Sequence, residues 1–144
     1  MIQRTSRDNA RTPMQWSAGE NAGFSSVKPW LKINANYKEV NVESEQNKND
    51  GVLSFWKEMI ALRKSSRVLQ EGSFKSVYES RGIYAFEREL DGEILTSVCN
   101  MTGKVQKLPR RWYQGEMVKS SYKSYDAQTL KPFEFRLTKK ERLK

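Results

Sequence analysis

The sequence contains no histidine, and this absence removes several kinds of active site. Histidine is the usual general base near neutral pH and the commonest metal ligand in proteins. Ser-His-Asp sites, Cys-His sites and histidine-ligated metal centres are therefore excluded within these 144 residues. The sequence also lacks a glycine-rich phosphate loop and clustered CxxC pairs, so we expect neither a cofactor nor a metal.

Cysteine is limited to one residue, and long apolar segments are missing. Cys99 cannot form an internal disulfide, and its place in the apolar run 94–99 favours a buried core thiol. No run approaches the roughly 18 apolar residues that a membrane span requires, and no apolar signal-peptide core follows Met1. We therefore expect a soluble, cytoplasmic chain without a membrane partner.

Acidic residues are outnumbered by basic ones, 17 against 26, which gives a formal net charge of +9. Such a charge attracts nucleic-acid phosphates. The lysines and arginines are nevertheless spread along the chain, and no recognition helix or RNA-binding motif accompanies them. We expect a solvated basic surface and no nucleic-acid partner, and a nucleic-acid binder ranks last among the hypotheses.

The first 49 residues are rich in polar residues and turn formers, which predicts a long loop. Loops of this length are usually functional or packed by their own side chains. Five side chains are candidates for that packing: Trp16, Phe24, Trp30, Ile33 and Tyr37.

Residues 50–65 carry apolar side chains at helical spacing, which predicts one amphipathic helix. Asn49 or Asp50 is suited to cap its first turn, and Arg63 and Lys64 suit its negative C-terminal end. The stripe is wide enough to need a substantial surface to pack on; its members are Val52, Phe55, Trp56, Met59 and Ile60.

Beyond residue 65 the pattern changes to short strands. The Asp91-Gly92 pair predicts a tight hairpin that makes residues 83–86 and 94–99 antiparallel neighbours. The expected strands together form a small antiparallel sheet or sandwich over residues 67–144. They cover residues 74–78, 83–89, 94–99, 116–120 and 132–137.

The segment Ser-Arg-Asp-Asn-Ala-Arg-Thr-Pro-Met-Gln-Trp at residues 6–16 resembles a hallmark of the oligo-1,6-glucosidases, trehalose-6-phosphate hydrolases, dextran glucosidases and sucrose isomerases of glycoside hydrolase family 13. The resemblance covers essentially the whole chain. It continues through residues 21–24, 29–30, 36–42, 60–64 and 130–134.

The resemblance implies an α+β fragment, composed of the final loop and helix of a (β/α)8 barrel followed by a small antiparallel β-sheet or sandwich domain. Residues 1–66 would be the C-terminal end of the catalytic barrel, with a loop at the substrate rim and the last helix. Residues 67–144 would be the C-terminal antiparallel β-domain. Active sites of such barrels lie at the C-terminal ends of the strands.

The family's reaction is retaining hydrolysis of an α-glucosidic bond by a nucleophilic carboxylate and an acid/base carboxyl about 5 Å apart. The motifs that hold these groups have no counterpart in this sequence. We therefore assign no catalytic residue and expect the chain alone to be inactive. The upstream barrel would be its missing partner, and a small oligosaccharide would be the parent's substrate.

Two arginines of the motif are candidate substrate-binding residues. In relatives, the arginine that Arg11 matches helps to hold the non-reducing-end glucose, and a planar guanidinium suits bidentate contact. Arg7 is a second candidate. The alternative is structural, since Arg7, Asp8 and Arg11 would also form an ion-pair network that pins the loop. For Arg11 both interpretations stay open.

Two departures from the family pattern bear on specificity and rigidity. Ser17 stands where oligo-1,6-glucosidases often have aspartate and trehalose-6-phosphate hydrolases have serine, which leaves isomaltose, dextran-derived oligosaccharides, trehalose 6-phosphate and sucrose open as substrates. Ala35 replaces a frequent proline, which reduces loop rigidity more than it affects chemistry.

A different class of function is a stand-alone carbohydrate-binding or interaction β-module without catalysis. Its sugar-stacking surface would be formed by exposed aromatic residues. The candidates are Trp112, Tyr113, Tyr122 and Tyr125. Independently of function, an uncovered helix stripe predicts self-association.

Overall fold

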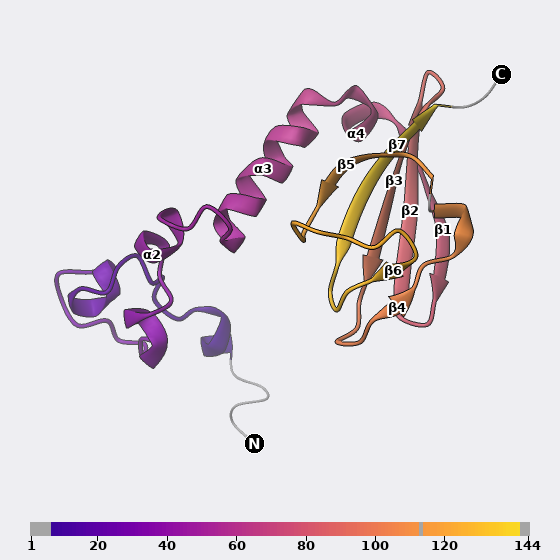
Figure 1. Ribbon diagram of the computed structural model, residues 1–144. Helices are drawn as coiled ribbons and strands as arrows, with labels where there is room; N and C mark the ends of the chain where they lie inside the picture. The colour runs from indigo at the N-terminus through magenta and orange to yellow at the C-terminus, as the bar shows by residue number, and fades with distance from the viewer. Residues whose placement is uncertain (1–6, 113, 142–144) are drawn as a thin grey trace. The chain divides into compact units, whose positions relative to one another are not determined.

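The computed structural model describes residues 7–112 and 114–141, and the chain divides into two compact units (Figure 1). Unit 1 is Met1–Met59 and unit 2 is Ile60–Lys144. The division falls within helix α3 (Val52–Ser65). This helix confirms the one predicted over residues 50–65, although it begins two residues later.

Unit 1 contains short helical turns in place of the long loop that the sequence predicts. Asn side chains start two of them: Asn34 Oδ1 accepts from the Asn36 amide, and Asn41 and Ser44 form a capping box with a 2.8 Å bond from the Ser44 amide to Asn41 Oδ1. Such reciprocal caps stabilise helices too short to show apolar periodicity. The elements are η1 (Arg7–Ala10), η2 (Glu20–Gly23), η3 (Ala35–Lys38) and α2 (Val42–Gln46).

The aromatic residues expected to pack the first loop do not form a core. Trp16, Phe24 and Trp30 are 51%, 49% and 83% exposed, so that expectation is wrong for them, whereas Ile33 and Tyr37 are half-buried. The buried residues here are small or polar and include Ala22 and Asn41. Unit 1 therefore owes its order mainly to hydrogen bonds.

The apolar stripe of α3 is open to solvent. Val52, Trp56 and Ile60 are 70%, 63% and 49% exposed, and α3 has no buried residue. At its start the Val52 amide donates to Glu45 Oε2 at 3.1 Å, so Glu45 caps the first turn. The capping role expected of Asn49 or Asp50 stays a prediction.

Unit 2 is built on one five-stranded antiparallel sheet in the order β1-β2-β3-β7-β5. The predicted hairpin is confirmed, with Leu90 opposite Glu93 and positive φ at Asp91 (53°) and Gly92 (87°). Helix α4 (Arg67–Glu71) precedes the sheet. The sheet strands are β1 (Ser73–Ser80), β2 (Ile83–Leu90), β3 (Glu93–Asn100), β5 (Glu116–Ser120) and β7 (Phe135–Glu141).

The last predicted strand is displaced. The sequence places it at 132–137, but β7 begins at Phe135, because Phe133 (φ 55°) and Glu134 belong to the turn before it. Two further strands of two residues each, β4 (Gln106–Lys107) and β6 (Thr129–Leu130), pair with each other and escaped prediction because they are too short to show alternation. A short helical turn, η4 (Arg110–Trp112), follows β4.

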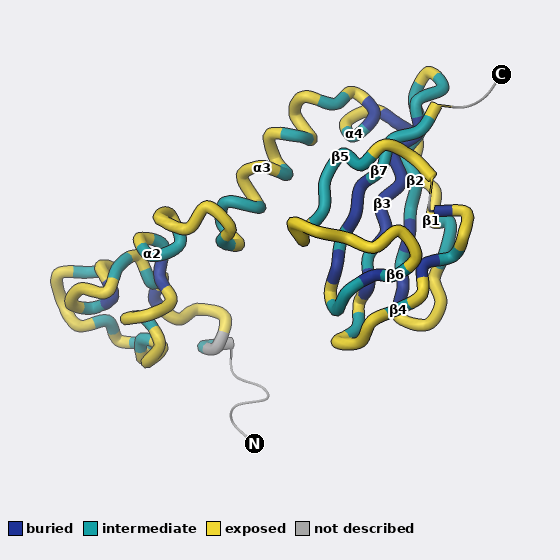
Figure 2. The backbone as a smooth tube through the Cα atoms, viewed as in Figure 1, coloured by how far each residue is buried: buried dark blue, intermediate teal, exposed yellow. Residues whose placement is uncertain are grey.

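Strand β3 is buried on both faces. Val98 packs in a cluster with Ala85, Leu108 and Leu130, whereas Leu95 packs with Val68 of α4. Successive side chains of a strand point to opposite faces, so the β4–β6 segment covers one face and the helical segment covers the other. Figure 2 shows the buried residues concentrated on these strands.

Cys99 lies near the end of β3 and is half-buried, less than the sequence analysis expected. Burial raises the pKa of its thiol, partly offset by a contact from Ser97. The thiol therefore stays protonated near neutral pH.

A buried ion pair fixes the start of β7. Arg136 Nε donates to Glu134 Oε1 at 2.7 Å, and their side chains are 4% and 0% exposed. The remaining polar atoms are also bonded: the Lys131 amide donates to Glu134 Oε2, and Arg136 donates to the Asp126 and Thr129 carbonyls. Removal of one partner would leave the other charge buried and unpaired.

Glu134→Ala is expected to lower the free energy of unfolding of the full chain by about 3–5 kcal/mol, because it strands the Arg136 guanidinium. Urea unfolding followed by far-ultraviolet circular dichroism measures the change. Glu71→Ala, which removes an exposed partner of Arg67, is the matched control and should have a far smaller effect. Equal effects of the two substitutions would contradict the role of the buried pair.

Glu45 gives the start of α3 a defined pH dependence. The hydrogen bond from Lys48 is the main cause that lowers the pKa of the Glu45 carboxyl below 4.5, and the Val52 and Leu53 amides act in the same direction. A group with a lowered folded-state pKa stabilises the fold above its unfolded pKa, and this contribution is lost as the pH falls through the folded pKa.

The interval from about pH 5.5 to about pH 3 spans the ordinary pKa range of glutamate. As the pH falls through this interval, the Val52 amide should lose protection against hydrogen exchange. Protection here means the intrinsic exchange rate of the amide divided by its measured rate. Glu45→Ala, which removes the acceptor, should show low protection throughout. Glu39→Ala, at an exposed glutamate outside this contact, should behave as the unmodified chain. NMR hydrogen exchange measures both, and unchanged protection in Glu45→Ala would rule out this cap.

Candidate functional site

The site is built on residues 12–17, the extended segment that follows η1 and carries the end of the family motif. Hydrogen bonds hold its backbone on two sides. The amides of Trp16 and Ser17 both donate to the Ala22 carbonyl, at 2.9 and 3.0 Å. The carbonyls of Gln15 and Trp16 accept from the amides of Val42 and Glu43 at the start of α2, both at 3.0 Å. The segment is therefore fixed between the η2 turn and α2.

The turn that supplies the Ala22 carbonyl has an unusual backbone. Asn21, Ala22 and Gly23 all have positive φ, at 50°, 57° and 66°, and Ala22 is fully buried. A Cβ atom on Gly23 would lie 2.6 Å from Ser17 Oγ, so glycine is required there. Backbone of this kind persists only where its surroundings enforce it, and it is concentrated at functional sites.

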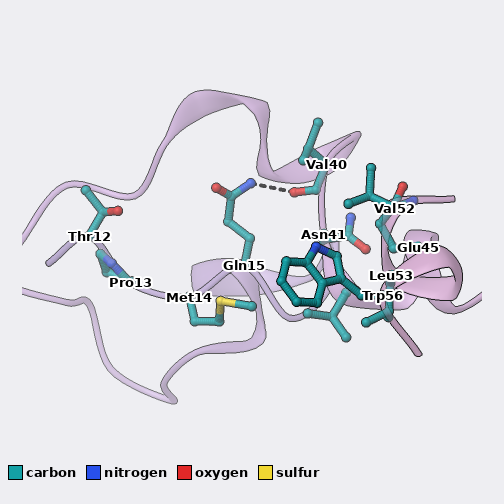
Figure 3. Close-up of a pocket in the computed structure, with 11 residues that line it drawn as sticks. Thr12, Pro13, Met14, Gln15, Val40, Asn41, Glu45, Val52, Leu53 and Trp56 are labelled. Atoms are coloured by element: carbon teal, nitrogen blue, oxygen red, sulfur yellow. Dashed lines mark hydrogen bonds between the residues drawn. The ribbon is translucent and has the colours of Figure 1, made fainter. Parts of the chain in front are cut away.

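The Gln15 side chain ties the same segment to the third turn. Its Nε2 donates to Asn36 Oδ1 at 3.0 Å. The same nitrogen donates to the Val40 carbonyl, a bond that Figure 3 shows. Asn36 lies in η3, next to Ala35. The two contacts hold η3 and the residues after it against the fixed segment. Sequence patterns alone did not reveal the role of Gln15 or the turn at Asn21 and Ala22, although the Asn-Ala-Gly triplet is a signal for positive φ.

Arg11 is engaged within its own turn. Its Nη2 lies 2.6 Å from Asp8 Oδ1, with side chains 56% and 49% exposed, and its amide donates to the Asp8 carbonyl. The Asp8–Arg11 ion pair is therefore present, as expected if these residues pin the loop. An exposed guanidinium with one carboxylate partner keeps other donors for a ligand. The side chain of Arg7 lies outside the described part of the structure.

An apolar cavity of about 430 Å³ lies beside the fixed segment (Figure 3). It is lined by Met14 and Gln15 from the segment, by residues 40–42 before and in α2, and by Val52 and Trp56 of α3. Its single acidic residue is Glu45, whose carboxylate already binds Lys48 and the Val52 amide. A cavity with one committed carboxylate cannot perform double-displacement glycoside hydrolysis.

Other kinds of site are not evident in the described ranges. No cluster of three or more cysteine, aspartate or glutamate residues suited to a metal occurs among residues 7–112 and 114–141. In the same part of the chain, every helix is too short or too polar to cross a membrane.

The aromatic surface of the alternative β-module is only partly present. Trp112 is 7% exposed and packs in the core against Tyr78, with ring centroids 4.9 Å apart, so its expected exposure is wrong. Tyr122 and Tyr125 are exposed, but Lys131 and Arg136 lie over their rings at 4.9 and 5.1 Å. Tyr113 lies outside the described residues.

Comparison with known proteins identifies the family. Residues 1–72 match the family described as alpha amylase, catalytic domain. The chain is similar to the probable oligo-1,6-glucosidase 2 of Bacillus subtilis (strain 168), with 44% identity over 67% of this chain and 18% of the relative. It is also similar to the trehalose-6-phosphate hydrolase of Escherichia coli (strain K12), with 36% identity over 78% of this chain and 20% of the relative.

Solved structures agree with the sequence comparisons. The crystal structure of isomaltulose synthase from Klebsiella sp. LX3 matches with a TM-score of 0.84 and 34% identity, over 93% of this chain and 26% of that one. The chain thus spans about a fifth to a quarter of the length of the proteins it matches. Half of the chain matches the family's catalytic domain, and the chain belongs to the α-amylase family of glycoside hydrolases, glycoside hydrolase family 13.

Proposed function

We propose that this chain is the C-terminal part of a cytoplasmic α-glucosidase that hydrolyses short α-linked oligosaccharides by the retaining mechanism. Its substrates are isomalto-oligosaccharides or trehalose 6-phosphate. Residues 1–66 form the end of the catalytic barrel with a loop at the substrate rim, and residues 67–144 form the C-terminal β-domain. The catalytic carboxylates lie outside residues 1–144, so the chain by itself is inactive.

The observation that carries this proposal is the fixed backbone of residues 12–17. Four hydrogen bonds and a strained turn hold a segment whose own residues provide no catalytic pair. Rigid placement is valuable in a loop that positions a substrate, because misplacement of a binding group by about 1 Å costs rate. The names of the similar relatives, oligo-1,6-glucosidase and trehalose-6-phosphate hydrolase, support the substrate class.

Within this proposal Arg11 binds the non-reducing-end glucose while its ion pair with Asp8 orients the guanidinium. The pair leaves donors for sugar hydroxyls and for a carboxylate of the barrel. Arg7 assists from the same turn. The cavity beside Met14 and the stripe of α3 are the surfaces that the rest of the barrel covers.

A chimera tests the proposal. The upstream part of the Bacillus subtilis oligo-1,6-glucosidase 2, joined to this chain, is expected to hydrolyse p-nitrophenyl α-glucoside, whereas the upstream part alone is expected to be inactive. Arg11→Lys in the chimera should lower kcat/KM by about 10–100-fold, because lysine keeps the charge but loses bidentate contact. Arg67→Lys, an exposed arginine in unit 2, is the matched control and should leave kcat/KM unchanged.

An inactive but folded chimera would contradict the proposal. Normal kcat/KM in Arg11→Lys would instead leave Arg11 only the task of pinning the loop through Asp8.

The open stripe of α3 makes a separate prediction about the isolated chain. We expect it to self-associate through Trp56 and Ile60, since exposed apolar stripes of this kind bury themselves when a partner is absent. Light scattering should give a mass above 16.8 kDa that increases with concentration. The double variant Trp56→Ser/Ile60→Ser should shift the mass toward the monomer, and the control Val27→Ser/Met101→Ser, at 69% and 67% exposed positions, should not. A concentration-independent monomer would refute this prediction.

The second candidate, a carbohydrate-binding β-module, rests on the exposed rings of Tyr122 and Tyr125. The burial of Trp112 reduces the aromatic surface that it needs. Isothermal titration with maltose and isomaltose distinguishes the two candidates, because saturable heat at millimolar sugar would favour the module.

A further inference from the structure

The cations of unit 2 differ in whether they have an acidic partner. Some form ion pairs: Arg136 with Glu134, Lys139 with Glu93 and Lys140 with Glu87. By contrast, Arg81, Lys107 and Arg110 form no ion pair with any carboxylate in the described ranges 7–112 and 114–141.

These three unpaired cations line two adjoining cavities. Arg81 and Lys107 line a cavity of about 380 Å³, and Lys107 and Arg110 line a second one of about 200 Å³. Neither lining includes an aspartate or a glutamate. Concave surfaces with positive charge and no acidic residue attract and concentrate anions.

The elements that carry the cations are fixed by backbone geometry. Arg81 occupies the turn between β1 and β2 with φ 52°, followed by Gly82 at 75°. Lys107 lies in β4, where it pairs with Thr129 of β6. Gln128 and Thr129 line the second cavity, and their amides donate to Asp126 Oδ1 at 2.6 and 3.0 Å. That carboxylate oxygen is therefore committed to the backbone.

The larger cavity also has an apolar wall. Tyr78 lines it and packs edge-on against the buried Trp112, and the Arg111 guanidinium stacks over both rings at 5.3 and 4.3 Å. Ile83, 3% exposed, and Pro109 complete this side. A rigid aromatic and aliphatic wall suits the apolar face of a sugar ring.

We propose that the cavity between Arg81 and Lys107 binds a small molecule that carries a phosphate ester on a sugar ring. The phosphate contacts the two cations, the Gln106 side chain offers a polar group beside them, and the ring lies against Tyr78. A volume of about 380 Å³ lies in the usual range of small-ligand sites, roughly 300–1,000 Å³. The site is confined to unit 2 and does not depend on the proposed glucosidase activity.

Equilibrium dialysis of the full chain with labelled glucose 6-phosphate, at constant ionic strength, tests the proposal. Saturable binding is expected. Inorganic phosphate should displace the label only at concentrations at least tenfold higher than unlabelled glucose 6-phosphate, and glucose should not displace it. Equal displacement by inorganic phosphate would overturn the sugar contact, and displacement by glucose would overturn the phosphate contact.

Matched variants locate the site. Arg81→Gln/Lys107→Gln should weaken binding at least tenfold. The control Lys57→Gln/Lys75→Gln removes the same charge from exposed positions outside both cavities and should bind normally. Arg110→Gln, with one cation removed from the neighbouring cavity, should weaken binding by less than the first pair. Equal losses in test and control would show non-specific ionic attraction and overturn the proposal, as would the absence of saturable binding.

Discussion

The Ala22 carbonyl oxygen is the acceptor on which the order of unit 1 depends. It receives the amides of Trp16 and Ser17, and it points toward them because residues 21–23 have positive φ. Residues 7–59 of this unit contain almost no apolar core, so hydrogen bonds replace the packing that normally fixes a segment. The Gln15 side chain and the α2 amides complete the arrangement from the other side. The strained turn is therefore the local origin of the fixed backbone at residues 12–17.

Unit 2 obtains its order in the opposite way, from a central strand covered on both faces. The clusters around Val98 and Leu95 place apolar layers on either side of β3, and the buried Arg136–Glu134 pair fixes the strand beside it. The segment that covers one face also carries Lys107, so the same packing that closes the core presents unpaired cations at its edge. Stability and the proposed anion site therefore have a common structural basis.

Elements with a long or repetitive signal were predictable from sequence. The apolar spacing of α3 predicted the helix because that signal is local and needs no packing partner. The Asp91-Gly92 turn predicted a hairpin in the observed register, because turn propensity and sheet packing agree there. The turns of unit 1 were not predictable, since their stability comes from contacts such as Gln15 to Asn36, 21 residues apart. The exposure of Trp112 was misjudged because its burial depends on Tyr78, a partner that alternation in sequence cannot identify. Arg11 was found only through the family motif, and its pairing with Asp8 was correctly anticipated as the structural alternative.

We propose that the fixed loop at residues 12–17 positions a substrate, and that the catalytic carboxylates lie in another part of the same glycoside hydrolase. The most direct test is the activity of the isolated chain on p-nitrophenyl α-glucoside, with a full-length relative as the positive control. We expect no hydrolysis above background, because the family motifs that hold the catalytic carboxylates have no counterpart in this sequence. Turnover above background by the purified chain would contradict the proposal, and would require such a pair within residues 1–144.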